Sequence, residues 1–160
     1  MKKFIISIDA GTTSNRSILF DLKGKPIFSS QKEFTQYFPK SGWVEHDPDE
    51  IWRTTIKTLK DVIQKAKKLK GEILSIGITN QRETTVLWDK KNGQPVYKAI
   101  VWQDRRQEEF CKKLRKQNKD TMIFNKTGLL IDSYFSGTKI KWILDNVPKA
   151  RQLMSKKQLL

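Results

Sequence analysis

"ISIDAGTTSNRSILFD", residues Ile6–Asp21, joins two apolar runs through a short polar turn. The first run, Phe4–Asp9, is of the kind found in a strand buried on both faces, and Ser17–Leu22 resumes as a second strand. A third run, Pro26–Phe34, follows the turn signal DLKGKP and alternates more, so it is expected near a sheet edge. The pattern therefore predicts an antiparallel meander of three strands.

The turn between the first two strands has the composition of a phosphate site. Gly11 has no Cβ and lets the backbone approach an anion closely. Three consecutive hydroxyl side chains, with the backbone N–H groups beside them, can donate hydrogen bonds to phosphate oxygens; they belong to Thr12, Thr13 and Ser14. Arg16 adds a charge-assisted donor. The competing interpretation is an ordinary polar hairpin, and the turn is no Walker A loop, because no Gly-Lys-Ser/Thr follows.

Asp9 ends the first strand beside this turn, where a bare phosphate would repel its carboxylate. The carboxylate fits that place only if Mg²⁺, or a water on it, lies between the two negative groups. Asp9 is therefore the candidate metal-associated acid.

A long helix is expected after the loop QYFPKSGWVEHDP. Asp47 is a good N-cap, Pro48 suits the first helical position and Glu50 supplies a capping-box carboxylate. Apolar residues then recur at helical spacing, and Gly71 closes the region; they are Trp52, Ile56, Leu59, Ile63 and Ala66. His46, the single histidine, precedes the cap and is expected to have a local structural role.

The rest of the chain predicts one more buried strand, a hairpin and a run of helices. Ile73–Thr79 is the buried strand, which makes the preceding helix a crossover. The hairpin has strands Thr84–Asp89 and Val96–Trp102 around the turn signal Asn92-Gly93. Helices are expected from Trp102 to about Lys119, near Lys139–Asp145 and from Pro148 to the end. We therefore expect one mixed α/β domain over residues 1–160, incomplete at its C-terminal end because the helical pattern is still running at Leu160.

Two further clusters of polar residues follow the ends of predicted strands. Arg82 and Glu83 come after Ile73–Thr79, at the strand end where open sheets with parallel strands bind ligands, and could bracket a polyhydroxy ligand. A surface ion pair is the competing interpretation. Trp102 ends the last strand and could cover the C–H side of a small polyol, or could be a core tryptophan.

Composition excludes several classes of protein. No apolar run approaches the roughly 20 residues that span a bilayer. The N-terminal apolar run is broken by Asp9, so we expect a strand and a mature N-terminus rather than a secretory signal. The net charge of +15 could attract nucleic acid or an anionic membrane, but no motif sharpens that idea, so no specific nucleic-acid partner and no membrane partner are expected. The lone Cys111 suits the cytoplasm and is expected to be a packed, inert thiol.

Five segments together carry a family resemblance: IDAGTTSNRSILFD, GWVEHDP, GITNQRETTVLWD, AIVWQDRR and TGLLIDSYFSGTKIKWIL. In order and spacing, the chain from about residue 4 to its end resembles the N-terminal part of the glycerol kinases of the FGGY carbohydrate kinase family. The resemblance implies a ribonuclease-H-like, actin-like ATPase fold with two α/β domains and a cleft. It also implies transfer of the γ-phosphoryl group of ATP to glycerol with Mg²⁺, giving sn-glycerol 3-phosphate and ADP, by a cytoplasmic enzyme that is often homo-oligomeric at full length.

The resemblance also assigns roles to individual positions. Asp9 matches the metal-associated acid; Thr12, Thr13, Ser14 and Arg16 match contacts to the nucleotide phosphates; Arg82, Glu83, Trp102 and Tyr134 match residues around glycerol. Tyr134 is indicated by the resemblance alone. Ser133 stands where the family commonly has proline, which would loosen that loop.

No catalytic base is assigned within the chain, because the family's general-base aspartate lies downstream of the matched region. We therefore expect little or no turnover from these 160 residues alone, and a marginal or aggregation-prone fold. The alternatives are a polyol- or sugar-binding module without catalysis, a kinase for a related polyol or sugar, and a basic remnant that binds nucleic acid.

Overall fold

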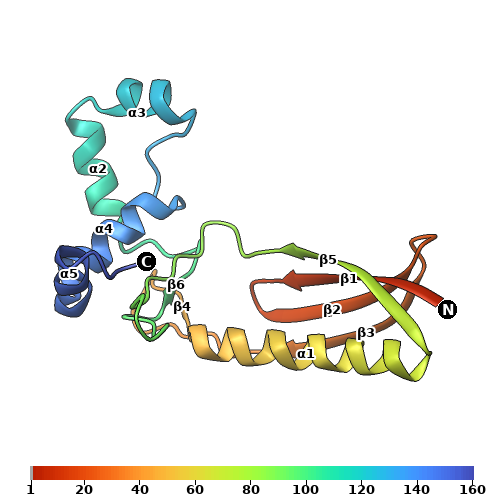
Figure 1. Cartoon of the computed structure of the whole chain (residues 1–160). Helices are drawn as coiled ribbons and strands as arrows, with labels where there is room; N and C mark the ends of the chain where they lie inside the picture. Colours follow the sequence, from red (N-terminus) through yellow and green to blue (C-terminus); the bar gives the residue numbers. More distant parts are fainter. Residues whose placement is uncertain (1) are drawn as a thin grey trace. The chain divides into compact units, whose positions relative to one another are not determined.

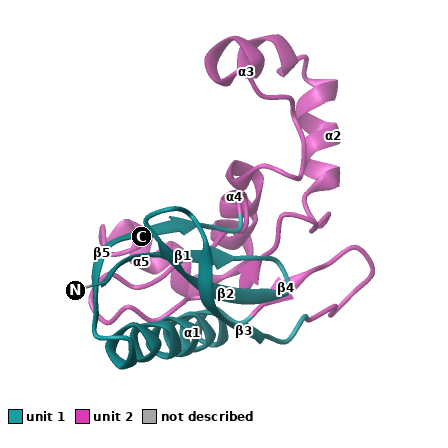
Figure 2. Ribbon diagram, turned by 90° about the vertical axis from the view of Figure 1, so that its right-hand side faces the viewer, with its two compact units in different colours: residues 1–36, 47–81 teal, residues 37–46, 82–160 magenta. Residues whose placement is uncertain are grey.

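The computed structural model describes residues 2–160, which form two compact units. The first unit comprises the residues up to Gln36 together with Asp47–Gln81, and the second comprises Tyr37–His46 and Arg82–Leu160 (Figure 2). We call them unit 1 and unit 2.

Unit 1 is built on one four-stranded sheet with the strand order β3-β2-β1-β5 (Figure 1). The strands are β1 (Lys2–Ala10), β2 (Ser14–Asp21), β3 (Pro26–Glu33) and β5 (Gly71–Thr79). β1 pairs with β2, and β2 with β3, in antiparallel fashion, so the predicted meander is confirmed. β5 pairs with β1 in parallel, as expected after a helical crossover.

Helix α1 (Pro48–Lys68) is that crossover, and it lies along one face of the meander (Figure 1). The Asp47 carboxylate caps it by accepting the N–H of Asp49 at 3.0 Å, as the sequence predicts. Val62 and Ala66 of the helix are fully buried in one core with Ile6, Leu19 and other residues of the sheet. This packing fixes the helix against β1 and β2, and a hydrogen bond of 2.9 Å between the Ser17 and Thr58 hydroxyls supports it.

The other face of the sheet, most of β5 and the start of α1 are exposed, which corrects three predictions. Ile5 is 39% exposed, so β1 is buried on one face rather than both, and β5, expected to be buried, exposes Ile78 at 72%. Trp52, expected in the core, is 65% exposed at the start of α1. Ile5 is exposed because the one helix of unit 1 covers only one face of the sheet. Ile78 pairs with the buried Ile8 and so lies on the helix side of the sheet, but on an edge strand that α1 leaves largely uncovered.

Unit 2 contains a short two-stranded sheet, β4 (Glu45–His46) and β6 (Ala99–Ile100), in antiparallel pairing. The predicted strand Thr84–Asp89 is wrong, because its residues form isolated bridges to three separate partners instead of one ladder. The predicted strand Val96–Trp102 shrinks to β6. The turn between them is confirmed: Gly93 adopts φ +70°, and Val96 N donates to the Leu87 carbonyl at 2.9 Å.

Four helices complete unit 2: α2 (Glu108–Lys116), α3 (Asp120–Thr127), α4 (Ser136–Asn146) and α5 (Pro148–Ser155). α3 is not predicted by the sequence. It buries no residue, so its sequence has no apolar stripe that would indicate a helix. α5 stops at Ser155, and Leu159 then bridges to Asp89, so the prediction of a helix to the end is wrong for the last residues.

The core of unit 2 forms around Leu87, Ile100, Ile143 and Ala150. His46 is fully buried in β4, which agrees with a structural role. Cys111 is fully buried as well, and burial raises the pKa of its thiol, so the predicted packed thiol is confirmed. Among residues 2–160, no helix combines the length and the apolar character that crossing a bilayer requires.

Candidate functional site

The polar turn of unit 1 brings Asp9 and Arg16 onto one face of the sheet. The two residues are direct partners in the antiparallel pairing of β1 with β2, and both side chains are exposed. Directly opposed residues project to the same side of a sheet. Asn15 and Ser17 project to the other side, where they bond to α1, so Asp9 and Arg16 lie on the face that α1 leaves open.

The backbone of this turn is held by its own hydrogen bonds. Gly11 N donates to the Ser14 carbonyl at 3.0 Å, and a Cβ at Gly11 would lie 3.0 Å from that same oxygen, which explains the glycine. Thr13 contributes its carbonyl, which accepts the N–H of Phe34 at 3.3 Å. The Ser14 hydroxyl accepts Gln31 Nε2 at 2.9 Å and keeps its own proton to donate. Thr13 is exposed and Thr12 is half-buried.

A magnesium ion at this turn would need few ligands from the protein. In the described part of the chain, residues 2–160, no group of three or more His, Cys, Asp or Glu side chains is placed to hold a metal. Mg²⁺ commonly uses one or two carboxylates and completes its shell with phosphates and water. The exposed Asp9 carboxylate fits that pattern for a metal that arrives with a nucleotide.

Unit 2 brings two of the predicted ligand-binding aromatics together. The rings of Trp102 and Tyr134 meet edge to face, with centroids 6.0 Å apart and planes inclined by 69°. A hollow of about 270 Å³ opens beside them; its lining residues are Trp102, Gln103, Asp104, Arg105, Asp132, Ser133 and Tyr134. An aromatic wall with several polar groups at this small size suits a small hydroxylated ligand.

Glu83 is tied to the same loop. Its Oε2 accepts both the backbone N–H of Ser136 at 2.7 Å and the Ser136 hydroxyl at 2.8 Å, at the start of α4. The Glu83 side chain therefore caps the N-terminus of α4. Glu83 has φ +63°, an uncommon conformation for a residue with a Cβ, which aims its side chain at α4. Arg82, immediately before it, is exposed.

Asp104 lines the hollow but is committed to structure. It is fully buried, and its two oxygens accept the Val44 N–H at 2.7 Å and three N–H groups of Arg106 at 2.7–2.9 Å. Arg106 also pairs with Glu45 at 2.8 Å and lies over the Trp43 ring at 3.8 Å. Burial alone would lower the pKa of Arg106, but Asp104 and Glu45 together raise it. Asp104 is therefore a poor candidate for a proton acceptor.

Sequence reasoning missed three contributors to this site. Asp132 lines the hollow and accepts the Tyr134 N–H at 2.7 Å, and Ser133 lines it while only 4% exposed. Lys139 of α4 is fully buried and donates to the Ser133 carbonyl at 2.9 Å and to the Tyr134 carbonyl. One signal was available: Lys139 stands four residues before the buried Ile143, on the apolar face of the helix.

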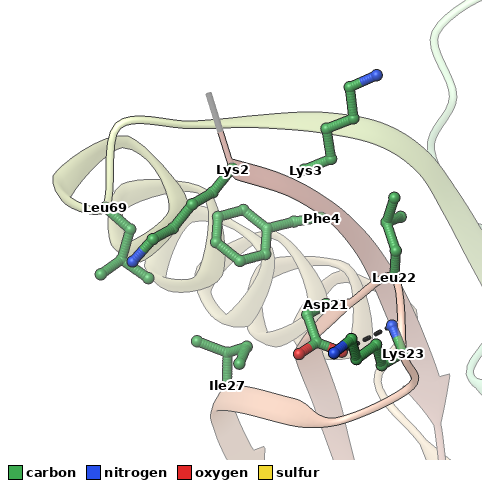
Figure 3. A pocket seen from close by; sticks show the side chains of 8 residues that line it. All are labelled: Lys2, Lys3, Phe4, Asp21, Leu22, Lys23, Ile27 and Leu69. Carbon is green, nitrogen blue, oxygen red and sulfur yellow. Dashed lines mark hydrogen bonds between the residues drawn. The ribbon is translucent and has the colours of Figure 1, made fainter.

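A second hollow, of about 550 Å³, lies in unit 1 at the opposite end of β1 from Asp9 (Figure 3). The Phe4 ring lies in the middle of its lining, with Ile27, Leu69 and Leu22 around the ring and lysine side chains at the rim. Because it is separated from the polar turn by most of the length of β1, the hollow is no part of the predicted phosphate site.

Comparison with known proteins tests the resemblance. Residues 4–159 match the FGGY family of carbohydrate kinases, N-terminal domain. The chain belongs to the FGGY family. The FGGY relatives with solved structures include the glycerol kinase of Plasmodium falciparum with ADP, which superposes with a TM-score of 0.93 at 35% identity and covers 99% of this chain and 32% of that one. The ribonuclease-H-like, actin-like ATPase fold is confirmed by this similarity.

Curated FGGY relatives are more similar in sequence. The chain is 60% identical to a glycerol kinase of Oceanobacillus iheyensis over 151 residues, which is 94% of this chain and 30% of that protein. It is 58% identical to a glycerol kinase of Malacoplasma penetrans over 159 residues, which is 99% of this chain and 31% of that protein. The chain thus spans about 30% of the length of the curated relatives that it matches.

Proposed function

We propose that this chain is the N-terminal part of a kinase that transfers the γ-phosphoryl group of ATP to glycerol, giving sn-glycerol 3-phosphate and ADP. The observation that carries the proposal is the assembly in unit 2. Trp102 and Tyr134 line one hollow, and Glu83, 53 residues before its partner Ser136, bonds to the start of the helix that follows Tyr134. These residues match the family's glycerol contacts, and the similarity to glycerol kinases supports glycerol as the substrate.

In this proposal the turn of unit 1 binds the nucleotide phosphates. The hydroxyls of Thr12, Thr13 and Ser14 donate to phosphate oxygens, and Arg16 neutralises part of their charge. Asp9 takes one position on Mg²⁺, which would neutralise charge on the transferred phosphoryl group. The open face on which Asp9 and Arg16 lie gives a bulky triphosphate access to both.

Unit 2 binds the alcohol in the same proposal. The Trp102 and Tyr134 rings cover the C–H side of glycerol, while Glu83 Oε1, the oxygen not bonded to Ser136, accepts a glycerol hydroxyl. Arg82, exposed beside it, donates to another hydroxyl. Pocket binding of this kind orients the nucleophile, which is most of what phosphoryl transfer asks of a protein.

Calorimetry at millimolar glycerol tests the alcohol side. We expect measurable binding to the full 160-residue chain and clear weakening in Arg82→Ala. Arg53→Ala, which removes an exposed arginine from α1 in unit 1, is the matched control and should bind like the unchanged chain. Absence of any binding heat, or equal weakening in both variants, contradicts the assignment.

Paramagnetic relaxation distinguishes a kinase from a polyol-binding module without catalysis. Phosphoryl transfer requires the γ-phosphate to reach a glycerol hydroxyl, so Mn²⁺–ADP should broaden the resonances of bound ¹³C-glycerol. Asp9→Asn should abolish that broadening while leaving glycerol binding intact. Glycerol binding that never responds to Mn²⁺–ADP would favour the polyol-binding module.

Turnover is a separate question, since the chain spans about 30% of its relatives. With ATP, Mg²⁺ and glycerol we expect little or no glycerol-dependent ADP release, because no carboxylate within the chain matches the family's general base. Comparing xylitol and ribitol with glycerol in the binding assay tests specificity for a related polyol. We propose a cytoplasmic location, in keeping with the buried, unpaired thiol of Cys111.

A further inference from the structure

Lys139 is the most unusual charged residue of unit 2. Lysine is almost never fully buried unless it is paired, yet Lys139 is 0% exposed and is among the largest fully buried side chains in the described part of the chain. Its Nζ donates to two consecutive backbone carbonyls, those of Ser133 and Tyr134. The predicted function gives this ammonium group no role.

The two carbonyls belong to the part of the chain that forms one wall of the hollow. Ser133 and Tyr134 both line it, and the Tyr134 ring stands against Trp102. The loop is short, running from the Asp132 turn to the start of α4 at Ser136. Two hydrogen bonds from one buried ammonium group therefore fix the backbone from which the Tyr134 ring projects.

We propose that Lys139 is the positioning residue of the hollow lined by Trp102 and Tyr134, which we call the polyol pocket. Its buried ammonium group holds the backbone carbonyls of Ser133 and Tyr134 and thereby fixes the backbone that bears the Tyr134 ring. The inference rests on the proposed function for the identity of the ligand. It also has a regulatory consequence: the neutral amine holds the loop less firmly, since a charge-assisted hydrogen bond is roughly twice as strong as a neutral one.

The surroundings of Lys139 bring its pKa into a range that solution experiments can cover. Burial lowers its pKa to about 8, while the carboxylates of Glu83, Asp104 and Asp132 and the Cys111 side chain oppose that shift. Below this pH the ammonium form holds the loop. Above it, the proposal predicts a looser Tyr134 and weaker polyol binding.

The decisive measurement pairs affinity with stability as a function of pH. A buried ammonium group costs free energy, so losing its proton above pH 8 makes the fold more stable. The proposal predicts the opposite trend for glycerol affinity, which should weaken about fivefold between roughly pH 7 and pH 9.5. A merely structural lysine would move affinity and stability in the same direction, or leave affinity unchanged.

Three variants of the full chain test the assignment by calorimetry with glycerol. Lys139→Met should bind weakly at every pH, without the midpoint near 8, and Lys139→Arg, whose guanidinium stays charged, should show no midpoint either. Lys141→Met removes an exposed lysine from the same helix, one that pairs with Asp145, and should keep the original profile. A flat profile in the unchanged chain, or an unchanged profile in Lys139→Met, overturns the proposal.

Nuclear magnetic resonance separates failure of this proposal from failure of the proposed function. The carbonyl ¹³C resonances of Ser133 and Tyr134 should shift with a midpoint near pH 8, whether or not glycerol binds, and Lys139→Arg should abolish that shift. If the shift is present and glycerol does not bind, the positioning contact stands and the polyol assignment fails. If the shift is absent, Lys139 does not hold the loop through its charge, even where Lys139→Met fails to fold.

Discussion

The polar turn of unit 1 and the hollow of unit 2 are built in opposite ways. The turn comes from one continuous stretch, Asp9–Arg16, and its geometry is set by the pairing of two neighbouring strands. The hollow takes its lining from residues 102–105 and 132–134, and Glu83 reaches the same loop through Ser136. The turn depends on hydrogen bonds within one stretch of chain, whereas the hollow depends on the contacts that hold several distant segments together.

That difference predicts where each site is vulnerable. Changes to the turn should act locally and leave most of unit 1 intact. Changes to the buried polar groups of unit 2 should affect stability and ligand binding together.

The largest effect is expected from Arg106→Leu, which leaves the buried carboxylates of Asp104 and Glu45 without the positive charge that pairs with both. Breaking a buried ion pair from one side costs about 3–5 kcal/mol of unfolding free energy. Hydrogen exchange, read separately for the two units, should show lost protection around β4 and β6 while the amides of β1 and β2 stay protected. Lys141→Leu, which breaks an exposed pair, should cost under about 1 kcal/mol.

Equal loss of protection in both units after Arg106→Leu would show that they unfold as one. The buried polar groups of unit 2 would then stabilise the whole chain rather than unit 2 alone.

Sequence reasoning succeeded where structure is local. The meander, the Asp47 cap and the turn at Gly93 follow from periodicity and turn chemistry, and the structure confirms them. Tyr134 was reached only through family resemblance, because an aromatic in a mixed loop has no local signature. That the turn of unit 1 binds nucleotide phosphates and the hollow of unit 2 binds a polyol stays a prediction.

The failures have a shared physical cause. Thr84–Asp89 has the alternation of a strand, but it pairs only through isolated bridges to Pro95, Ile100 and Leu159, and no local pattern reveals that. Lysine is usually solvated, and the spacing of Lys139 from Ile143 indicates the apolar face of a helix without showing that the fold buries the ammonium group completely. Tertiary context decides burial and pairing, and a single sequence shows neither directly.

The second largest effect is a pH dependence of the free energy of unfolding that arises from Lys139, a residue of unit 2. Lys139 has a pKa of about 8 in the folded chain and about 10.4 when unfolded. Between those values the unfolded state binds more protons, so the free energy of unfolding should rise with pH, by up to about 3 kcal/mol from this group. Below pH 8 both states are protonated and the contribution is constant.

Denaturant unfolding from about pH 7 to pH 10.5 gives the free energy of unfolding of the unchanged chain and of Lys139→Met. Their difference at each pH measures the contribution of Lys139, because the titration of the other lysines and of the tyrosines affects both proteins equally. A difference that stays constant across the range, or that falls with pH, contradicts the assignment of a lowered pKa.

A smaller and local effect is expected from Gly11→Ala. The added Cβ would lie 3.0 Å from the Ser14 carbonyl oxygen, so the turn must shift by a few tenths of an ångström. We expect a cost of about 1–2 kcal/mol in unfolding free energy and a clear loss of ADP affinity by calorimetry. Glycerol affinity should be unchanged, since the polyol pocket lies in unit 2.

Gly77→Ala is the matched control for that experiment, because a Cβ at Gly77 on β5 meets no atom within 4 Å. It should leave ADP affinity alone. Equal losses in both variants would show that the turn is no more constrained than the strand, and the local description of the phosphate site would fail.

The smallest change in stability, with a visible consequence for solubility, is expected from Ile78→Thr. Ile78 is 72% exposed on β5, while its register partner Ile8 on β1 is 5% exposed, so the same substitution can be made on neighbouring strands in opposite environments. Ile78→Thr should change the unfolding free energy by less than about 0.5 kcal/mol, whereas Ile8→Thr should cost about 2 kcal/mol or more. Light scattering on heating should show slower aggregation for Ile78→Thr, because an exposed apolar edge strand is a template for association. If Ile78→Thr destabilises the chain as much as Ile8→Thr does, β5 is covered in solution and its exposed edge is not a source of the predicted aggregation.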